Sequence, residues 1–311
     1  MSAATGTNIV GVPDALRTIT KSEYLSWVRR PVRTKKVNTM ATEESSGKLR
    51  EFDPSRYVFT QSDQPVLIKS RTVLPARREN FEVTTADGKR LVGELALPEG
   101  EIKATLVTFH PLPTHGGYMD SHVYKKASFR LPALANIAVL RFNTRGTSSI
   151  RGTSEGVFDG GFAEKKDFDA ILQYAVERQL PNIWLIGWSF GTELVLKYAP
   201  EHASEFVGAI LLSPPLHRVH PAELDEWNKI SNPLYAFIPE FDDYLRPTEA
   251  RERFKSIART QVVPFENCKH LWVGEKSVNS VINALVSVVT GQQTTLPTEY
   301  NGPVAEEITE P

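Results

Sequence analysis

The stretch WLIGWSFGTELVL, residues 184–196, contains a Gly-x-Ser-x-Gly pattern in which Ser189 lies between Gly187 and Gly191. An apolar run typical of a strand precedes the serine, and a run with helical spacing follows it. In a strand–turn–helix setting the two glycines permit a sharp turn, which leaves the serine hydroxyl exposed at the edge of a sheet. The pattern alone is weak evidence, so the surrounding sequence must distinguish a nucleophile from a structural turn.

Strand-like runs and helical patterns alternate on both sides of this stretch. Two alternating runs around Asp87-Gly88 predict a β-hairpin. Further strands are expected within residues 103–110, 135–146, 182–189, 206–215, 233–243 and 260–270, and helices within 162–179, 191–203, 221–230, 248–258 and 275–291. This order predicts an α/β fold with a mostly parallel central sheet and helices on both faces. The segment 216–233 is too short for a large cap, and a small helical flap is expected there.

Composition excludes several classes of protein. The chain has 311 residues, a net charge of -1 and no apolar run near the roughly 20 residues of a membrane span. We therefore expect no nucleic acid partner and no integral membrane segment. A single cysteine, Cys268, excludes an intramolecular disulfide, and the N-terminus lacks the pattern of a secretory signal, so a cytoplasmic location is expected. No nucleotide-binding glycine loop is present, and we expect no cofactor.

The two ends of the chain differ from its middle. Residues 1–75 are polar and predict a largely irregular extension, with a short helical pattern at 22–30 and a basic cluster at 29–36. A solvated linker is favoured over contact with an acidic partner or phosphate head groups for that cluster. Residues 76–290 are expected to form the α/β domain, and residues 291–311 a disordered acidic tail.

A serine nucleophile needs a base and an orienting acid from later in the chain. His270 follows the last predicted strand and precedes the final helix, which makes it the candidate base. His202, His217 and His220 lie in polar segments near helix ends, where surface roles are expected.

The candidate acid lies after the strand at 233–243. That segment offers Asp242 and Asp243; Asp242 is favoured, Asp243 suits turn formation or helix capping, and Glu240 is a poor third. The order Ser189, Asp242, His270 is the Ser…Asp…His order of hydrolases built on such a sheet.

An oxyanion site needs two main-chain donors. One is the amide of Phe190, directly after the serine, and the other belongs to the loop after an earlier strand. In His110-Pro-Leu-Pro of that loop only His110 and Leu112 carry an N–H, and we favour Leu112. His110 is expected to shape the loop, and His110 or His115 as a metal ligand is a minor alternative because no carboxylate or cysteine has ligand spacing. No metal is expected.

Other side chains near the predicted sheet edge are candidates for binding substrate. They are His110, Trp188 and Arg145. For Arg145, together with Arg141 and Asn143, a hydrogen-bonded loop scaffold is an equally good interpretation. Asp159 and Glu164 are ambiguous in the same way.

These motifs together resemble those of the α/β-hydrolase superfamily over residues 78–290. More narrowly, the chain is similar to a bacterial group of dienelactone-hydrolase-like predicted hydrolases with HPHPxxGGxMxxxV and RFNFRGxGxSxG loops. The corresponding stretches are HPLPTHGGYMDSHV (110–123) and RFNTRGTSSIRGTSEG (141–156), and FDGGFAEKKDFDA (158–170) continues the match. The resemblance implies a nucleophile at Ser189, a base at His270 and an acid at Asp242.

The chain also departs from the pattern of that group. Leu112 replaces the second histidine of HPHP, and the loop after Arg145 is longer. Dienelactone hydrolases proper use a cysteine nucleophile, so their substrate does not transfer to this chain; Cys268 is expected to be a buried filler.

The expected function is a serine hydrolase of the carboxylesterase or thioesterase type, acting on a small acyl substrate. An acyltransferase with the same three residues and a non-catalytic interaction protein on the same fold are the alternatives. The sequence does not indicate the oligomeric state.

Overall fold

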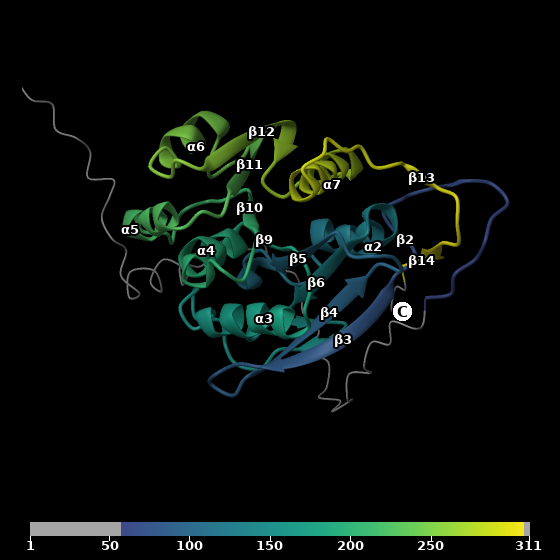
Figure 1. Cartoon of the computed structure of the whole chain (residues 1–311), viewed down its shortest axis with the longest axis horizontal. Coiled ribbons are helices and arrows are strands. Elements are labelled where there is room, and N and C mark those ends of the chain that lie inside the picture. The colour runs from purple at the N-terminus through teal and green to yellow at the C-terminus, as the bar shows by residue number, and fades with distance from the viewer. Residues whose placement is uncertain (1–56, 308–311) are drawn as a thin grey trace, which may run out of the picture. The chain divides into compact units, whose positions relative to one another are not determined.

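The computed structural model of the chain describes residues 57–307 (Figure 1). The helical pattern at 22–30 and the basic cluster at 29–36 lie outside the described residues. An eight-stranded sheet forms the centre, with the strand order β12-β11-β10-β9-β5-β6-β4-β3. The strands from β12 to β6 are parallel, and β4 and β3 are antiparallel to their neighbours. The predicted mostly parallel sheet is confirmed.

Each predicted strand appears close to its expected position. The hairpin around Asp87-Gly88 joins β3 to β4. The bounds are β3 Arg77–Thr84, β4 Arg90–Leu97, β5 Ala104–Phe109, β6 Ile137–Phe142, β9 Ile183–Trp188, β10 Gly208–Leu212, β11 Leu234–Phe241 and β12 Thr260–Lys269. Every residue of β5, β6, β9 and β10 is buried, as is typical of central parallel strands covered on both faces.

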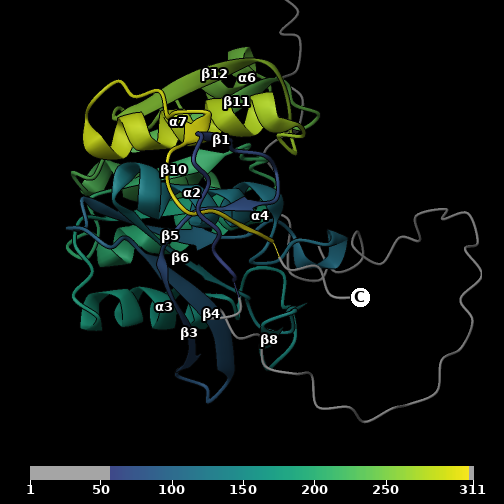
Figure 2. The same ribbon diagram turned by 90° about the vertical axis from the view of Figure 1, so that its right-hand side faces the viewer.

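Helices cover both faces of the sheet. One face packs against α3 (Lys165–Glu177), α4 (Phe190–Tyr198), α5 (Pro221–Asp225) and α6 (Pro247–Arg253). The other packs against α2 (His122–Ala135) and α7 (Glu275–Thr290), which lie side by side in Figures 1 and 2. Among residues 57–307, three short 3-10 helices occur in the connections: η2 (Pro113–His115), η3 (Ala199–His202) and η4 (Glu226–Lys229). Between β10 and β11 the chain forms only α5 and η4, so this connection holds no large cap.

Helix α2 was not predicted, and its composition explains why. Its helical pattern is interrupted by Pro132 and by the charged residues Lys126 and Arg130, all three of which are buried. Both cations form ion pairs with Glu275 at the start of α7. The periodicity of apolar side chains therefore does not mark the buried face of this helix.

The predicted disordered tail and the domain boundary at residue 76 both need correction. Strand β13 (Glu299–Tyr300) pairs with β1 (Val66–Leu67), and β14 (Ala305–Glu306) pairs with β2 (Thr72–Val73). Residues 57–75 and 292–307, called the strap below, thus run together beside α2 and α7 (Figure 2). Polar composition predicted disorder, but main-chain pairing needs few apolar side chains.

A further short hairpin, β7 (Ser148–Ser149) with β8 (Gly152–Thr153), extends from the loop after β6. Within residues 57–307, no helix has the length and apolar character needed to cross a bilayer.

Candidate active site

Ser189 occupies a sharp turn between β9 and α4. Its φ of 50° and ψ of -113° are strained for a residue with a side chain. A Cβ at Gly187 would lie 2.6 Å from the Gly191 carbonyl oxygen, and one at Gly191 would lie 1.9 Å from the Phe109 carbonyl oxygen. Both glycines are therefore required, and the turn is pressed against the loop that follows β5.

His270 lies directly after β12, and its Nε2 is 2.9 Å from the hydroxyl oxygen of Ser189. Two side chains on neighbouring strand ends hold its main chain: Trp188 Nε1–H and the Ser213 hydroxyl donate to the His270 carbonyl at 3.3 and 3.0 Å. This pair of donors restricts the position from which the imidazole reaches Ser189.

Asp242 approaches the other nitrogen of the same ring. Its carboxylate oxygens are 3.1 and 3.0 Å from His270 Nδ1. The carboxylate is 2% exposed and also accepts the N–H of Tyr244 at 2.8 Å. Asp243 and Glu240 are exposed, and Glu240 accepts the Asn267 N–H. Of the three candidate acids, only Asp242 contacts His270.

The loop after β5 is held by the buried imidazole of His110. Thr144 N–H donates to Nε2 at 3.1 Å, so the ring proton lies on Nδ1, which donates to the Pro111 carbonyl at 2.7 Å. Burial lowers the pKa of His110 to about 4, which keeps the ring neutral near pH 7.

The hydrogen bond from His110 to the Pro111 carbonyl sets the direction of the Leu112 N–H. The peptide bond is trans, so the Leu112 N–H points away from the carbonyl that His110 holds. Among the described residues, this N–H has no hydrogen-bond acceptor. The Phe190 N–H lies at the first residue of α4, where helical N–H groups have no partner within the helix. Both predicted oxyanion donors are thus available to a ligand.

The three predicted substrate-binding side chains are engaged by the protein. His110 is bonded as described above, and Trp188 is buried and donates to His270. Arg145 forms ion pairs with Asp87 and Asp167. These are contacts of scaffold residues, and the geometry does not support a substrate-binding role for the three side chains.

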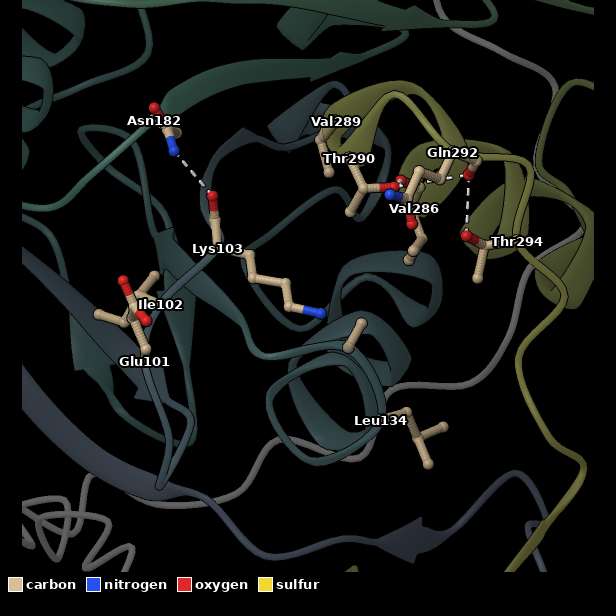
Figure 3. A pocket seen from close by; sticks show the side chains of 11 residues that line it. Glu101, Ile102, Lys103, Leu134, Asn182, Val286, Val289, Thr290, Gln292 and Thr294 are labelled. Carbon is tan, nitrogen blue, oxygen red and sulfur yellow. Dashed lines mark hydrogen bonds between the residues drawn. The ribbon is translucent and has the colours of Figure 1, made fainter.

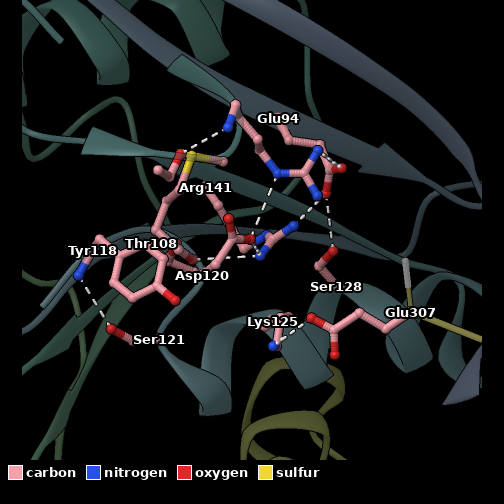
Figure 4. Close-up of polar contacts among 12 residues, drawn as sticks. Glu94, Thr108, Tyr118, Asp120, Ser121, Lys125, Ser128, Arg141 and Glu307 are labelled. Carbon is pink, nitrogen blue, oxygen red and sulfur yellow. Dashed lines mark hydrogen bonds and ion pairs between the residues drawn. The ribbon is translucent and has the colours of Figure 1, made fainter. Parts of the chain in front are cut away.

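The other ambiguous residues also belong to loop scaffolds. Asn143 accepts the Met119 N–H at 3.0 Å, and Glu164 accepts the N–H groups of Asp159 and Gly161. Arg141 lies in a buried cluster of charges with Glu94 and Asp120 beneath the loop after β5 (Figure 4).

One aromatic neighbour of His270, Tyr244, was not found from the sequence. The ring of Tyr244 is 4.6 Å from the imidazole of His270, at an interplanar angle of 68°. His217, which was expected to have an unrelated surface role, packs its ring against the same tyrosine at 5.3 Å. Tyr244 lies only two residues after Asp242, and that proximity is the one signal that could have indicated it.

A cavity of about 550 Å³ lies at the opposite edge of the sheet from Ser189. It borders the residues just before β5 and β9, Lys103 and Asn182, and the ends of α2 and α7 (Figure 3). Asn182 donates to the Lys103 carbonyl there at 2.9 Å. In the described part of the chain, no three His, Cys, Asp or Glu side chains are grouped so that they could hold a metal ion.

The chain matches no family model and no curated protein sequence. Among solved structures, XC6422 from Xanthomonas campestris, described as an α/β serine hydrolase without a lid, is 23% identical with a TM-score of 0.56, and the match covers 70% of this chain and 96% of that one.

Two further solved structures have the same fold at lower identity. The Pyrococcus furiosus esterase Pf2001 is 15% identical with a TM-score of 0.57, covering 76% of this chain and 100% of the esterase. Est1E from Butyrivibrio proteoclasticus is 16% identical with a TM-score of 0.55, covering 68% and 98%. Together with the sheet order and the turn at Ser189, these similarities show that the chain has the α/β-hydrolase fold.

Proposed function

We propose that this chain is a serine hydrolase that cleaves a carboxylic ester or thioester through an acyl-enzyme intermediate. The observation that carries the proposal is the hydrogen-bonded series from Ser189 Oγ through both nitrogens of His270 to Asp242, with distances of 2.9 and 3.0 Å. A structural turn has no need of a strained serine aligned with an imidazole and a buried carboxylate. The fold alone would not support this activity, because it serves many functions.

Each residue has a defined part in the proposed reaction. His270 Nε2 takes the hydroxyl proton as Ser189 Oγ bonds to the carbonyl carbon, and Asp242 stabilises the resulting imidazolium. The ester C–O or C–S bond then breaks, and His270 returns the proton to the leaving group. Water, deprotonated by His270, attacks the acyl-enzyme, releases the carboxylic acid and restores Ser189.

The negative charge on the carbonyl oxygen needs donors that are already in place. The amides of Phe190 and Leu112 are the candidates, since neither N–H donates to another residue within 57–307. Contact of Gly191 with the Phe109 carbonyl brings the turn and the Leu112 loop together, which supports this assignment. The short connection between β10 and β11 supports a rather open site for small acyl groups.

Labelling by a fluorophosphonate probe tests the proposal. The wild type is expected to label and to hydrolyse p-nitrophenyl acetate, with turnover falling toward decanoate. Ser189→Ala should lose labelling, and kcat should fall about 10⁴- to 10⁶-fold because the nucleophile and base act as a unit. Ser256→Ala removes an exposed serine as the matched control and should label like the wild type.

Two outcomes would contradict the proposal. One is a folded wild type that neither labels nor hydrolyses any ester or thioester of the series. The other is labelling that persists unchanged in Ser189→Ala. Product analysis with an added alcohol as acceptor separates hydrolysis from acyl transfer, because transfer would give the new ester in place of the acid.

A further inference from the structure

The leaving group of an ester substrate must lie beside His270. The leaving oxygen receives its proton from Nε2, so it comes within hydrogen-bond distance of that atom. Groups attached to this oxygen therefore contact whatever flanks the imidazole ring. Asp242 contacts Nδ1 of the imidazole and Ser189 contacts Nε2. The residue that packs against the imidazole ring therefore remains as the neighbour that the leaving group can contact.

That neighbour is Tyr244, whose ring lies 4.6 Å from the imidazole. The tyrosine is 51% exposed, so a large part of its surface is open to solvent. Only the imidazole of His270 separates it from the hydroxyl of Ser189. Leu271 and Val273, on the loop that carries His270, are exposed as well. Apolar side chains are thus exposed on both loops that meet at His270.

Tyr244 is also held in position before any substrate arrives. Its main-chain N–H donates to Asp242 at 2.8 Å, and the ring of His217 packs against it at 5.3 Å with an interplanar angle of 78°. The tyrosine ring is therefore flanked by two imidazoles in edge-to-face arrangements. An aromatic surface fixed in this way can stack with a ligand at little cost in side-chain entropy.

We propose that Tyr244 recognises the leaving group and that the site favours esters of aromatic alcohols. The inference rests on the proposed function and adds to it the class of alcohol released. In the reaction the aromatic alcohol departs with the proton from His270 while the acyl group stays on Ser189. Contact between the two aromatic rings should favour such an ester over an aliphatic one of similar size by about 2- to 10-fold in kcat/KM.

The test compares benzyl acetate with cyclohexylmethyl acetate. Both release a primary alcohol of similar size and acidity, so the aromatic character of the leaving group is the main difference. The wild type should prefer benzyl acetate, Tyr244→Phe should keep the preference, and Tyr244→Leu should remove it. Phe241→Leu makes the same change at a residue that is 42% exposed and has no ring contact with His270 among the described residues, and it should keep the preference.

A second pair of substrates places the ring on the other side of the ester. Methyl phenylacetate is an isomer of benzyl acetate and carries its ring on the acyl group. Its rate relative to methyl cyclohexylacetate should be the same in the wild type and in Tyr244→Leu. A Tyr244-dependent preference in this pair, instead of the benzyl pair, would overturn the proposal.

Failure of the inference differs from failure of the proposed function. The fluorophosphonate releases fluoride, which has no ring, so Tyr244→Leu should still label Ser189 within a few-fold of the wild-type rate. Labelling without any preference for benzyl acetate overturns the role of Tyr244 and leaves the hydrolase proposal intact. Equal losses on all four esters would reduce Tyr244 to a positioning residue for His270. A wild type that neither labels nor hydrolyses these esters would overturn both.

Discussion

At the scale of single residues, His110 links a buried side chain to a main-chain donor of the candidate site. Its two ring nitrogens have opposite roles, since Nε2 accepts from Thr144 and Nδ1–H donates to the Pro111 carbonyl. This arrangement requires the neutral ring. A protonated ring would bring a second N–H against the Thr144 amide inside a buried site. Acid should therefore disturb the Leu112 loop through this residue.

The stability of the protein should depend on pH through His110. Burial lowers its pKa from 6.5 to about 4 in the folded state, so the unfolded chain binds more protons between these values. The contribution of neutral His110 to stability is fully present above the pKa of the unfolded chain and is lost as the pH falls toward the pKa of the folded state. The free energy of unfolding should therefore fall by about 2 to 3 kcal/mol between pH 7 and 4.5. Urea unfolding of the wild type and His110→Asn at both pH values measures this loss.

The asparagine variant separates titration from hydrogen bonding. Its amide can still donate to Pro111 but cannot titrate, so its free energy of unfolding should fall less steeply with acid. We expect the variant to be less stable than the wild type at pH 7, because the Thr144 N–H loses its acceptor. The difference in free energy of unfolding between the two proteins should be smaller at pH 4.5. If the free energy of unfolding fell equally with pH in the two proteins, His110 would not be the cause of the lower stability in acid.

Some residue contacts at the site follow from sequence and others do not. Ser189, Asp242 and His270 each follow a strand of the parallel sheet, so topology alone predicts that they share one edge. The choice of Asp242 over Asp243 depends on which carboxylate is buried, and the sequence does not reveal this. The contact of Trp188 with the His270 carbonyl joins segments 82 positions apart, which no local pattern could indicate.

At the scale of elements, central strands were the easiest to predict and the edges of the fold the hardest. Strands buried on both faces appear as continuous apolar runs, which is why β5, β6, β9 and β10 were recognised. Helix α2 lacks a recognisable apolar periodicity because its buried face includes two cations that are paired with Glu275 of α7. The strands of the strap are each two residues long, which is too short to show an alternation of apolar and polar side chains.

The strap is anchored by a small apolar cluster in which Ala305 packs with Tyr57, Val73 and Phe129. Ala305→Asp would place an unpaired carboxylate in a site that is 4% exposed and should cost about 2 kcal/mol. The Thr60 and Val304 amides, which bond to each other's carbonyls, should then exchange about 30-fold faster. Hydrogen exchange read by mass spectrometry measures this effect.

Glu306→Ala is the control for this change, since Glu306 is the exposed neighbour in the same strand. Its exchange should match the wild type. Unchanged exchange in Ala305→Asp would mean that the cluster does not hold the strap in place.

At the scale of the whole molecule, one buried group of charges connects the hairpin, the sheet and the loop of the candidate site. Glu94 on β4 is fully buried and forms ion pairs with Arg78, Arg141 and Arg151. Arg141 also pairs with Asp120, which lies at the end of the loop that carries Leu112 (Figure 4). Burial raises the pKa of Glu94, but the three arginines outweigh it and hold the pKa well below its usual range.

Removing Glu94 should therefore destabilise the whole domain, because three buried arginine side chains would lose their shared partner. We expect Glu94→Ala to lower the free energy of unfolding by about 3 to 5 kcal/mol. Glu82→Ala is the matched control on the neighbouring strand: Glu82 pairs with Arg90 while both side chains are about half exposed, and its loss should cost under about 1 kcal/mol. Urea unfolding at pH 7 measures both variants. Similar losses for the two would mean that burial does not set the strength of the Glu94 contacts, and that the loop near the candidate site is held by other contacts.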